Sequence, residues 1–177
     1  IPEWLNEWIG SFMVSTFYFT SGWITGINNK PIKPNELLKK RIKQLGVPYF
    51  WFSLLIIAFD FIWALAEFMD TRILLRDIYK TFTLRGIGTL WFLPVLIFGE
   101  YLFCIIKNSK KPAICGILVV LGSVLILYVY NYIWAPLLNL NDIYKLIDSP
   151  IRAFVTSLFA CPIIILGYIS AKRWGNQ

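Results

Sequence analysis

The sequence predicts an all-α fold, a polytopic membrane helical bundle of about five transmembrane helices with short interfacial helices. Two observations support this class. Hydrophobic residues make up 58% of the 177-residue chain, which is more than a soluble domain usually carries. They also form long runs that lack the period-2 alternation of a transmembrane barrel. We expect a single membrane domain over residues 1–177, with neither internal repeats nor a linker.

Five apolar windows approach the length of about 20 residues that a helix needs to cross a membrane. The windows cover residues 9–27, 46–68, 89–107, 113–134 and 151–171. Eleven of the 17 Lys and Arg residues lie in the loops 28–45 and 107–112 and in the C-terminal tail. Because basic loops stay on the cytoplasmic side, we expect these three segments to be cytoplasmic in a multi-pass protein of the cell (inner or plasma) membrane.

Two segments on the opposite side have the pattern of short amphipathic helices. Over residues 71–82, apolar side chains recur at spacings of three and four, while cations repeat every four on another face. This pattern predicts a helix lying in the outer interface, capped by Asp70 or Thr71. A weaker version of the pattern over residues 139–150 predicts a second short helix ahead of the last window.

The composition excludes several kinds of chemistry. The chain has no histidine, which removes the usual general base near neutral pH. Cys104, Cys115 and Cys161 lie in or beside apolar runs without a CxxC spacing, so we expect neither a disulfide framework nor a metal site. The net charge of +7 is concentrated in loops between apolar windows. Membrane topology explains this charge better than binding to nucleic acid does.

Two carboxylates lie deep in predicted spans. Asp60 is inside the second window and Glu100 is inside the third, where a charged side chain costs roughly 3 kcal/mol on insertion scales. Ionisable residues at such depth usually face the bundle interior or a water-filled cavity, which makes both of them candidate functional residues. The alternative is that each pairs with polar groups only for packing. Glu67 lies nearer the predicted outer interface.

Three stretches stand out in order along the chain: SFMVSTFYFTSGW, LKKRIKQLGVPYFW and TLWFLPVLIFGEY. Each has an ordinary explanation in close helix packing, in loop charge or in an interfacial tryptophan. Arg41, at the start of a predicted helix, could also bind a phosphate bidentately through its planar guanidinium.

Taken together, the three stretches resemble the acyltransferase-3 family of integral-membrane O-acyltransferases over most of residues 11–105. That family shows stretches such as SFHMPLFFFISGY, then KKRxxRLLxPYxxW, then HLWFLxxL. By position, Ser21 and Gly22 match its Ser-Gly pair and Arg41 matches its loop arginine. The Pro-Tyr and Trp-Phe of the later motifs are matched by Pro48, Tyr49, Trp91 and Phe92.

The resemblance implies transfer of an acyl group, usually acetyl from acetyl-CoA, to a hydroxyl of an extracytoplasmic carbohydrate or similar acceptor. It implies acetyl-CoA or another acyl-CoA as donor, bound by Arg41 through its phosphates from the cytoplasmic side and by Ser21 and Gly22. The expected partners are the lipid bilayer, acyl-CoA and the carbohydrate acceptor, with no nucleic acid and no metal.

The family has about ten helices, and its catalytic histidine lies on a helix before the first window seen here. The resemblance therefore implies that this chain is an N-terminally truncated portion with no catalytic residue of its own, inactive alone. Met13 replaces a second family His, Ser15 a Pro and Gln44 another Arg. These departures put full activity or the usual acceptor in doubt, and an inactive relative would fit the missing histidines. A second alternative is a non-enzymatic transporter or binding protein whose path is lined by Asp60 and Glu100.

Overall fold

The computed structural model describes residues 3–28, 31–138 and 142–174, and within these ranges it contains helices and turns but no strand. The all-α prediction is therefore confirmed. The helices are α1 (Glu3–Asn28), α2 (Pro34–Arg41), α3 (Val47–Leu65), α4 (Thr71–Phe82), α5 (Phe92–Lys107), α6 (Pro112–Val129), α7 (Ala135–Leu137) and α8 (Asp142–Trp174). Two π-helical turns, η1 (Ile42–Gly46) and η2 (Tyr130–Trp134), join α2 to α3 and α6 to α7.

Three helical runs in the described part of the chain are long and apolar enough to cross a membrane: Pro34–Leu65, Pro112–Leu137 and Ile143–Trp174. By contrast, α5 has 16 residues. At 1.5 Å per residue it is about 24 Å long, which is shorter than the roughly 30 Å of a bilayer core. A multi-pass membrane protein is thus supported, while the count of five spans stays a prediction.

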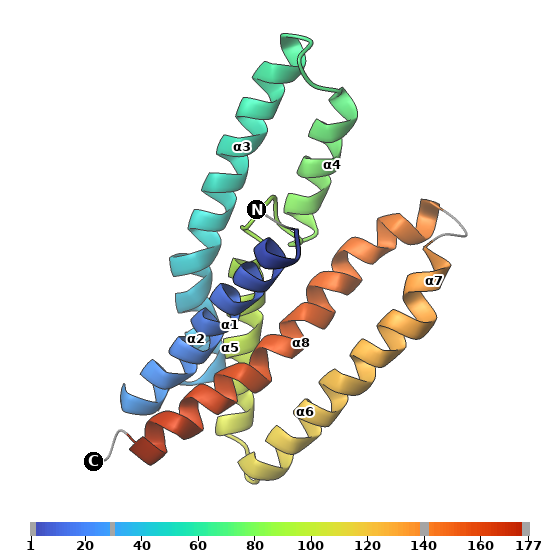
Figure 1. Cartoon of the computed structure of the whole chain (residues 1–177). Coiled ribbons are helices and arrows are strands. Elements are labelled where there is room, and N and C mark those ends of the chain that lie inside the picture. The colour runs from blue at the N-terminus through green and yellow to red at the C-terminus, as the bar shows by residue number, and fades with distance from the viewer. Residues whose placement is uncertain (1–2, 29–30, 139–141, 175–177) are drawn as a thin grey trace.

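The core lies where α1, α5 and α8 meet (Figure 1). The pair of α1 and α8 makes the most extensive contact between elements, and α5 packs against α8 as well. The buried residues of this core are Tyr18, Val95, Leu96, Phe103, Ile106, Ala160, Cys161 and Ile164. Outside this core, α6 lies along α8, and the hairpin of α3 and α4 extends away from it (Figure 1). Most large apolar side chains of α3 are exposed, as expected for a helix that faces lipid or further helices.

Small residues allow α1 and α8 to approach closely. A Cβ added at Gly22 would overlap the backbone carbonyl of Ile164, and one added at Gly167 would overlap the carbonyl of Phe19. The two glycines thus face each other's helix reciprocally. This is the small-residue packing by which membrane helices replace a hydrophobic driving force with close van der Waals contact.

The basic segments gather at one end of the bundle. The C-terminal ends of α1 and α8, the start of α2 and the turn between α5 and α6 all lie there (Figure 1). Lys107 of α5 and Lys172 of α8 both lie over the ring of Tyr168, at 5.2 and 5.1 Å from its centroid. The basic segments that the sequence predicts on one side of the membrane therefore do lie at one end of the bundle. That this end faces the cytoplasm stays a prediction.

The amphipathic helix predicted after the second window is present as α4, and its predicted cap is confirmed. Asp70 precedes the helix and accepts a hydrogen bond from the backbone N–H of Arg72 at 2.9 Å. Figure 1 shows α4 running back alongside α3. Its position in the outer interface of a membrane stays a prediction.

The prediction of a short helix over 139–150 followed by a separate span from residue 151 is wrong. Residues 139–141 lie outside the described chain, and Asp142–Trp174 forms one helix that contains Pro150 and Pro162. A proline lacks the N–H that would bond to the carbonyl four residues earlier. For Pro150 that carbonyl belongs to Leu146, and it accepts a hydrogen bond from the hydroxyl of Tyr79. A tertiary contact from α4 thus satisfies the group that the proline leaves without its helical partner.

This contact makes a double-mutant prediction. We expect Tyr79→Phe to lower the free energy of unfolding by about 1 kcal/mol, because the Leu146 carbonyl loses its partner. In a Pro150→Ala background the residue 150 N–H can bond to that carbonyl, so Tyr79→Phe should cost less there. Unfolding in detergent of the four proteins measures the coupling. Equal costs in both backgrounds would contradict this account of α8.

Candidate functional site

The buried carboxylate of Glu100 joins three helices. In the middle of α5, it accepts a hydrogen bond from the Ser21 hydroxyl of α1. Arg41 at the end of α2 donates to the same carboxylate from Nη2 to Oε1 at 2.9 Å, and its Nε forms an ion pair with Oε2. Arg41 therefore grips Glu100 through two nitrogens, the geometry that a planar guanidinium fits best. Three residues that the sequence marks for different reasons meet at one point.

The local sequence explains how Arg41 is presented. Pro34 lies in the first turn of α2, where its missing N–H costs nothing, and Arg41 ends the helix. The π-helical turn η1 follows directly, and such turns occur frequently at functional sites. Within η1, Gln44 accepts a hydrogen bond from Arg41 Nη1 at 3.2 Å. The guanidinium is thus held by Glu100 from α5 and by Gln44 from its own helical run.

Ser21 and Gly22, which the sequence marks as a pair, serve different neighbours. Consecutive residues of an α-helix point about 100° apart, because there are 3.6 residues per turn. Ser21 accordingly reaches Glu100, whereas Gly22 packs against the backbone of α8 at Ile164. The structure therefore places Ser21 at the site and Gly22 in the helix contact beside it.

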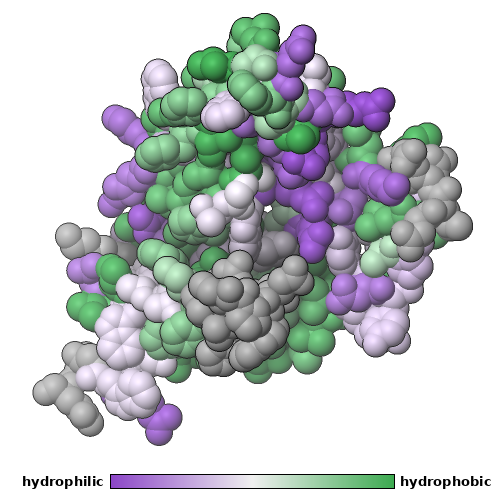
Figure 2. Space-filling view, turned by 45° about the horizontal axis from the view of Figure 1, so that its top comes forward, coloured by the Kyte–Doolittle hydropathy of each residue, from purple (hydrophilic) through white to green (hydrophobic). Residues whose placement is uncertain are grey.

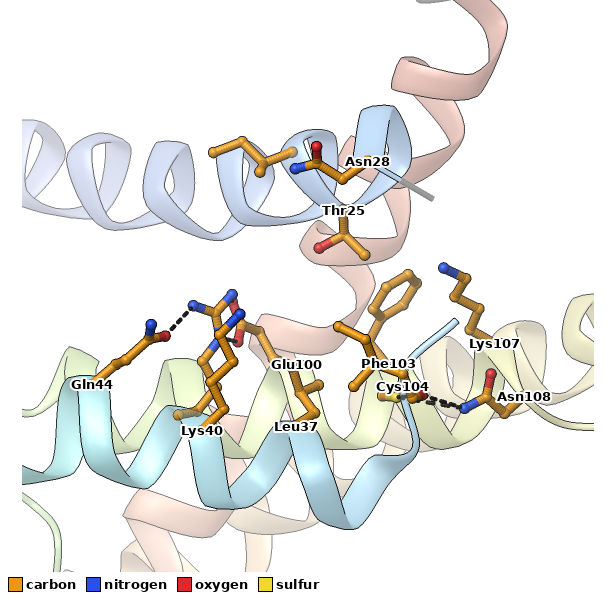
Figure 3. A pocket seen from close by; sticks show the side chains of 13 residues that line it. Thr25, Asn28, Leu37, Lys40, Gln44, Glu100, Phe103, Cys104, Lys107 and Asn108 are labelled. Atoms are coloured by element: carbon orange, nitrogen blue, oxygen red, sulfur yellow. Dashed lines mark hydrogen bonds and ion pairs between the residues drawn. The ribbon is translucent and has the colours of Figure 1, made fainter. Parts of the chain in front are cut away.

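A pocket of about 330 Å³ opens beside this cluster, between α1 and α2 and against α5 (Figure 3). Its lining contains Lys40, Arg41 and Lys107, and Glu100 is the acidic residue among the lining residues that the structure describes. Three cations against one carboxylate leave the pocket positive. The other lining residues are Ile24, Thr25, Asn28, Ile32, Leu37, Gln44, Phe103, Cys104 and Asn108.

The far wall of the pocket is fixed by polar contacts between the segment before α2 and the end of α5. Asn108 donates from Nδ2 to the backbone carbonyl of Ile32 at 3.0 Å, and Cys104 Sγ lies 3.4 Å from the same oxygen. Figure 3 shows Cys104, Lys107 and Asn108 on this side and Lys40, Gln44 and Glu100 on the other. The second half of α5 therefore forms one side of the pocket, from Glu100 to Lys107.

Arg41 keeps hydrogen-bonding capacity toward the pocket. A guanidinium has five N–H donors. The described hydrogen bonds to Gln44 and Glu100 use one N–H on Nη1 and one on Nη2, while Nε lies in the ion pair with Glu100. One N–H on each terminal nitrogen is left for a ligand, and an anionic oxygen is the partner that such donors favour.

The structure does not bring Asp60 to this site. At 1.5 Å per residue, Asp60 lies about 28 Å further along the helical run of α2, η1 and α3 than Arg41 does. The two intramembrane carboxylates predicted as candidates, Asp60 and Glu100, therefore belong to different regions of the fold.

The remaining motif residues hold helices together. The hydroxyl of buried Tyr49 donates to the carbonyl of Thr81 at 2.9 Å, which ties the start of α3 to the end of α4. Pro48 lies in the first turn of α3. Phe92 stacks on Phe17 of α1 with ring centroids 5.7 Å apart. Trp91 directly precedes α5 and lines a second cavity at the other end of that helix.

Lys40 and Lys107 line the pocket but are not among the predicted site residues, although the sequence contains a signal for both. Lys107 follows Glu100 by two helical turns and so lies on the same face of α5. Lys40 directly precedes Arg41 in the basic segment 28–45. Gln44, which departs from the family pattern, accepts a hydrogen bond from Arg41.

The fold and the site define a multi-pass helical membrane protein with a positive pocket built around a buried arginine–glutamate pair. A family model described as an acyltransferase domain, that of the acyltransferase-3 family, matches residues 2–177. The chain therefore belongs to the acyltransferase-3 family. No curated protein and no solved structure matches it.

Proposed function

We propose that this chain provides the donor-binding site of a membrane acyltransferase. The enzyme transfers an acyl group, in the simplest case acetyl, from acyl-CoA to a hydroxyl of an extracytoplasmic carbohydrate or similar acceptor. The observation that carries the proposal is that buried Glu100 holds Arg41 through a hydrogen bond and an ion pair at a pocket with surplus positive charge. Membership of the acyltransferase-3 family supports the reaction class.

The chemistry of the pocket suits the phosphates of a coenzyme A thioester. Lys40, Arg41 and Lys107 offer three cationic donors from α2 and α5. Charge-assisted hydrogen bonds to phosphate are roughly twice as strong as neutral ones. A volume of about 330 Å³ is at the low end for ligand pockets, so the pocket would hold one part of a donor as large as acyl-CoA.

Glu100 acts as a positioning residue in this proposal. Its carboxylate neutralises one charge of the pocket but fixes the guanidinium plane, so that Arg41 meets a phosphate without first losing side-chain freedom. Ser21 fixes the same carboxylate from α1. Because Glu100 already accepts from two residues, and because the chain has no histidine, we assign these residues donor binding and orientation rather than proton transfer.

The topology is consistent with a donor that arrives from the cytoplasm. The pocket lies at the end of the bundle where the basic segments gather, and that charge would attract a polyanion and raise its local concentration (Figure 1). The alternative of a transport path lined by Asp60 and Glu100 gains no support. Glu100 contacts Arg41, whereas Asp60 lies about 28 Å further along the run of α2, η1 and α3 than Arg41 does.

The two lysines provide the test. We expect Lys40→Ala combined with Lys107→Ala to weaken coenzyme A binding at least tenfold at low salt, because two phosphate-facing charges are lost. Both lysines are outside the ion pair with Glu100, so the protein should stay folded. Calorimetric titration of coenzyme A into the purified protein, with any natural flanking sequence, measures the affinity.

A matched control is Lys43→Ala combined with Lys110→Ala. These lysines lie at the same end of the bundle but do not line the pocket. The control should change the affinity by less than about threefold, because exposed charges at a distance are screened. Equal losses in both double variants would mean that general charge, and not this pocket, attracts coenzyme A.

A further inference from the structure

We call the pocket beside Arg41 and Glu100 the donor pocket. A second cavity lies at the opposite end of α5 from it. It has a volume of about 610 Å³, and its cationic lining residues are Lys80 of α4, Arg85 of the following turn and Arg152 of α8. No carboxylate is among the lining residues that the structure describes. Figure 2, in which this end of the bundle is turned forward, shows hydrophilic side chains gathered around a hollow.

Two of these cations form ion pairs with buried carboxylates that do not line the cavity. Asp77 lies 3.5 Å from Lys80 Nζ, and Asp148 lies 3.7 Å from Arg85 Nη1. Asp148 also accepts from Tyr130 at 2.8 Å and from Trp134 at 3.2 Å. Both ion pairs are longer than the 2.7–2.9 Å of a tight charge-assisted bond, so the cations keep donors for a ligand.

Arg152 forms no ion pair within the described residues. It lies one turn before Thr156, whose hydroxyl donates to the backbone carbonyl of Arg152 at 2.7 Å. The described lining of this cavity is therefore cationic, and an anion is the ligand whose charge complements it.

A third cavity adjoins the second and has the opposite character. It measures about 490 Å³ and shares Leu84, Val95 and Ala153 with the cationic cavity. Its remaining walls come mainly from apolar side chains of α5 and α8: Pro94, Phe98, Leu102, Phe154 and Leu158. Along α5 it runs from Pro94 to Leu102, whereas the cationic cavity ends at Val95. The apolar space therefore extends from the charged space toward the middle of the bundle.

We propose that these adjoining cavities bind a phosphate-bearing lipid. Its phosphate lies among Lys80, Arg85 and Arg152, and its hydrocarbon chain lies in the apolar cavity beyond Val95 and Ala153. The proposal that a phosphate-bearing lipid binds here rests only on the two cavities and their lining residues. The assignment of this lipid as the carrier of the hydroxyl-bearing acceptor rests on the proposed acyltransferase function, and it places donor and acceptor at opposite ends of α5.

The test is direct binding of four probes to the purified protein in neutral detergent, without acyl-CoA: polyprenyl monophosphate, phosphatidylglycerol, the neutral polyprenol and inorganic phosphate. We expect at least one phosphate-bearing lipid to bind tenfold or more tightly than the polyprenol and inorganic phosphate, because only it fills both cavities. Whichever phosphate-bearing lipid binds more tightly identifies the source, a lipid carrier or the bilayer. Equal affinity of inorganic phosphate and both lipids would overturn the proposal.

Two variants locate the binding. Arg152→Gln should weaken lipid binding at least fivefold, whereas Arg72→Gln, which removes an exposed cation of α4 outside the cavities, should not. Ala153→Leu fills the junction and should weaken lipid binding while inorganic phosphate binds as before. Equal effects of Arg152→Gln and Arg72→Gln would overturn the site. Coenzyme A binding, measured on the same samples, reports separately on the donor pocket.

Discussion

Arg41→Met is expected to lower the free energy of unfolding by about 3 kcal/mol, because it leaves the Glu100 carboxylate buried without its cation. The side chain of Glu100 is 5% exposed, whereas that of Arg41 is 28% exposed. An unpaired charge on buried Glu100 therefore costs more than an unpaired charge on the more exposed Arg41. For this reason Glu100→Gln alone should lower the free energy of unfolding less than Arg41→Met does. Denaturation of the purified protein in detergent micelles measures both losses.

The double variant Arg41→Met with Glu100→Gln is the control for this prediction. Removing both charges avoids an unpaired ion, so this protein should recover most of the stability that Arg41→Met loses. Arg41→Lys separates stability from binding, because lysine keeps the charge but lacks the planar fork. It should retain more stability than Arg41→Met yet bind coenzyme A more weakly than the natural protein. A double variant no more stable than Arg41→Met would contradict the assigned ion pair.

Gly22→Leu is expected to have the other large effect, the loss of packing between α1 and α8. A Cβ at Gly22 already overlaps the Ile164 carbonyl, and backbone cannot move aside as a flexible side chain can. Overpacking usually costs 1–3 kcal/mol, and we expect roughly 3 kcal/mol here because two helices must separate. Thermal unfolding in detergent gives the loss.

Gly122→Leu is the matched control, since a Cβ at Gly122 of α6 meets nothing within 4 Å. It should leave the thermal midpoint nearly unchanged, whereas Gly167→Ala on the facing side of α8 should resemble Gly22→Leu. If Gly22→Leu and Gly122→Leu unfold at the same temperature, close approach of α1 and α8 does not stabilise the fold.

The sequence marks the members of the donor site but not their meeting. Glu100 is marked by the cost of a carboxylate in an apolar helix, and Arg41 and Ser21 are marked by motifs. That all three share one contact depends on how α1, α2 and α5 pack, and no spacing along the chain encodes this. For the same reason Asp60 looks equivalent to Glu100 in the sequence, although the fold places it elsewhere.

Helix class and charge distribution were predictable because they depend on local composition, whereas helix limits depend on tertiary partners. Pro150 is a sound reason to end a helix when only the chain itself is considered. The hydroxyl of Tyr79, distant in sequence, satisfies the Leu146 carbonyl and lets α8 continue. Likewise, the π-helical turn that follows Arg41 has no reliable signature in the sequence, although it positions Gln44.

We propose above all that the pocket beside Arg41 binds the phosphates of the acyl donor. A structure of the protein with bound acyl-CoA tests it most directly. We predict phosphate oxygens within about 3 Å of Arg41 and of Lys40 or Lys107, with the Arg41 contact to Glu100 retained. Acyl-CoA bound away from this pocket, with Arg41 in contact only with Glu100 and Gln44, would contradict the account.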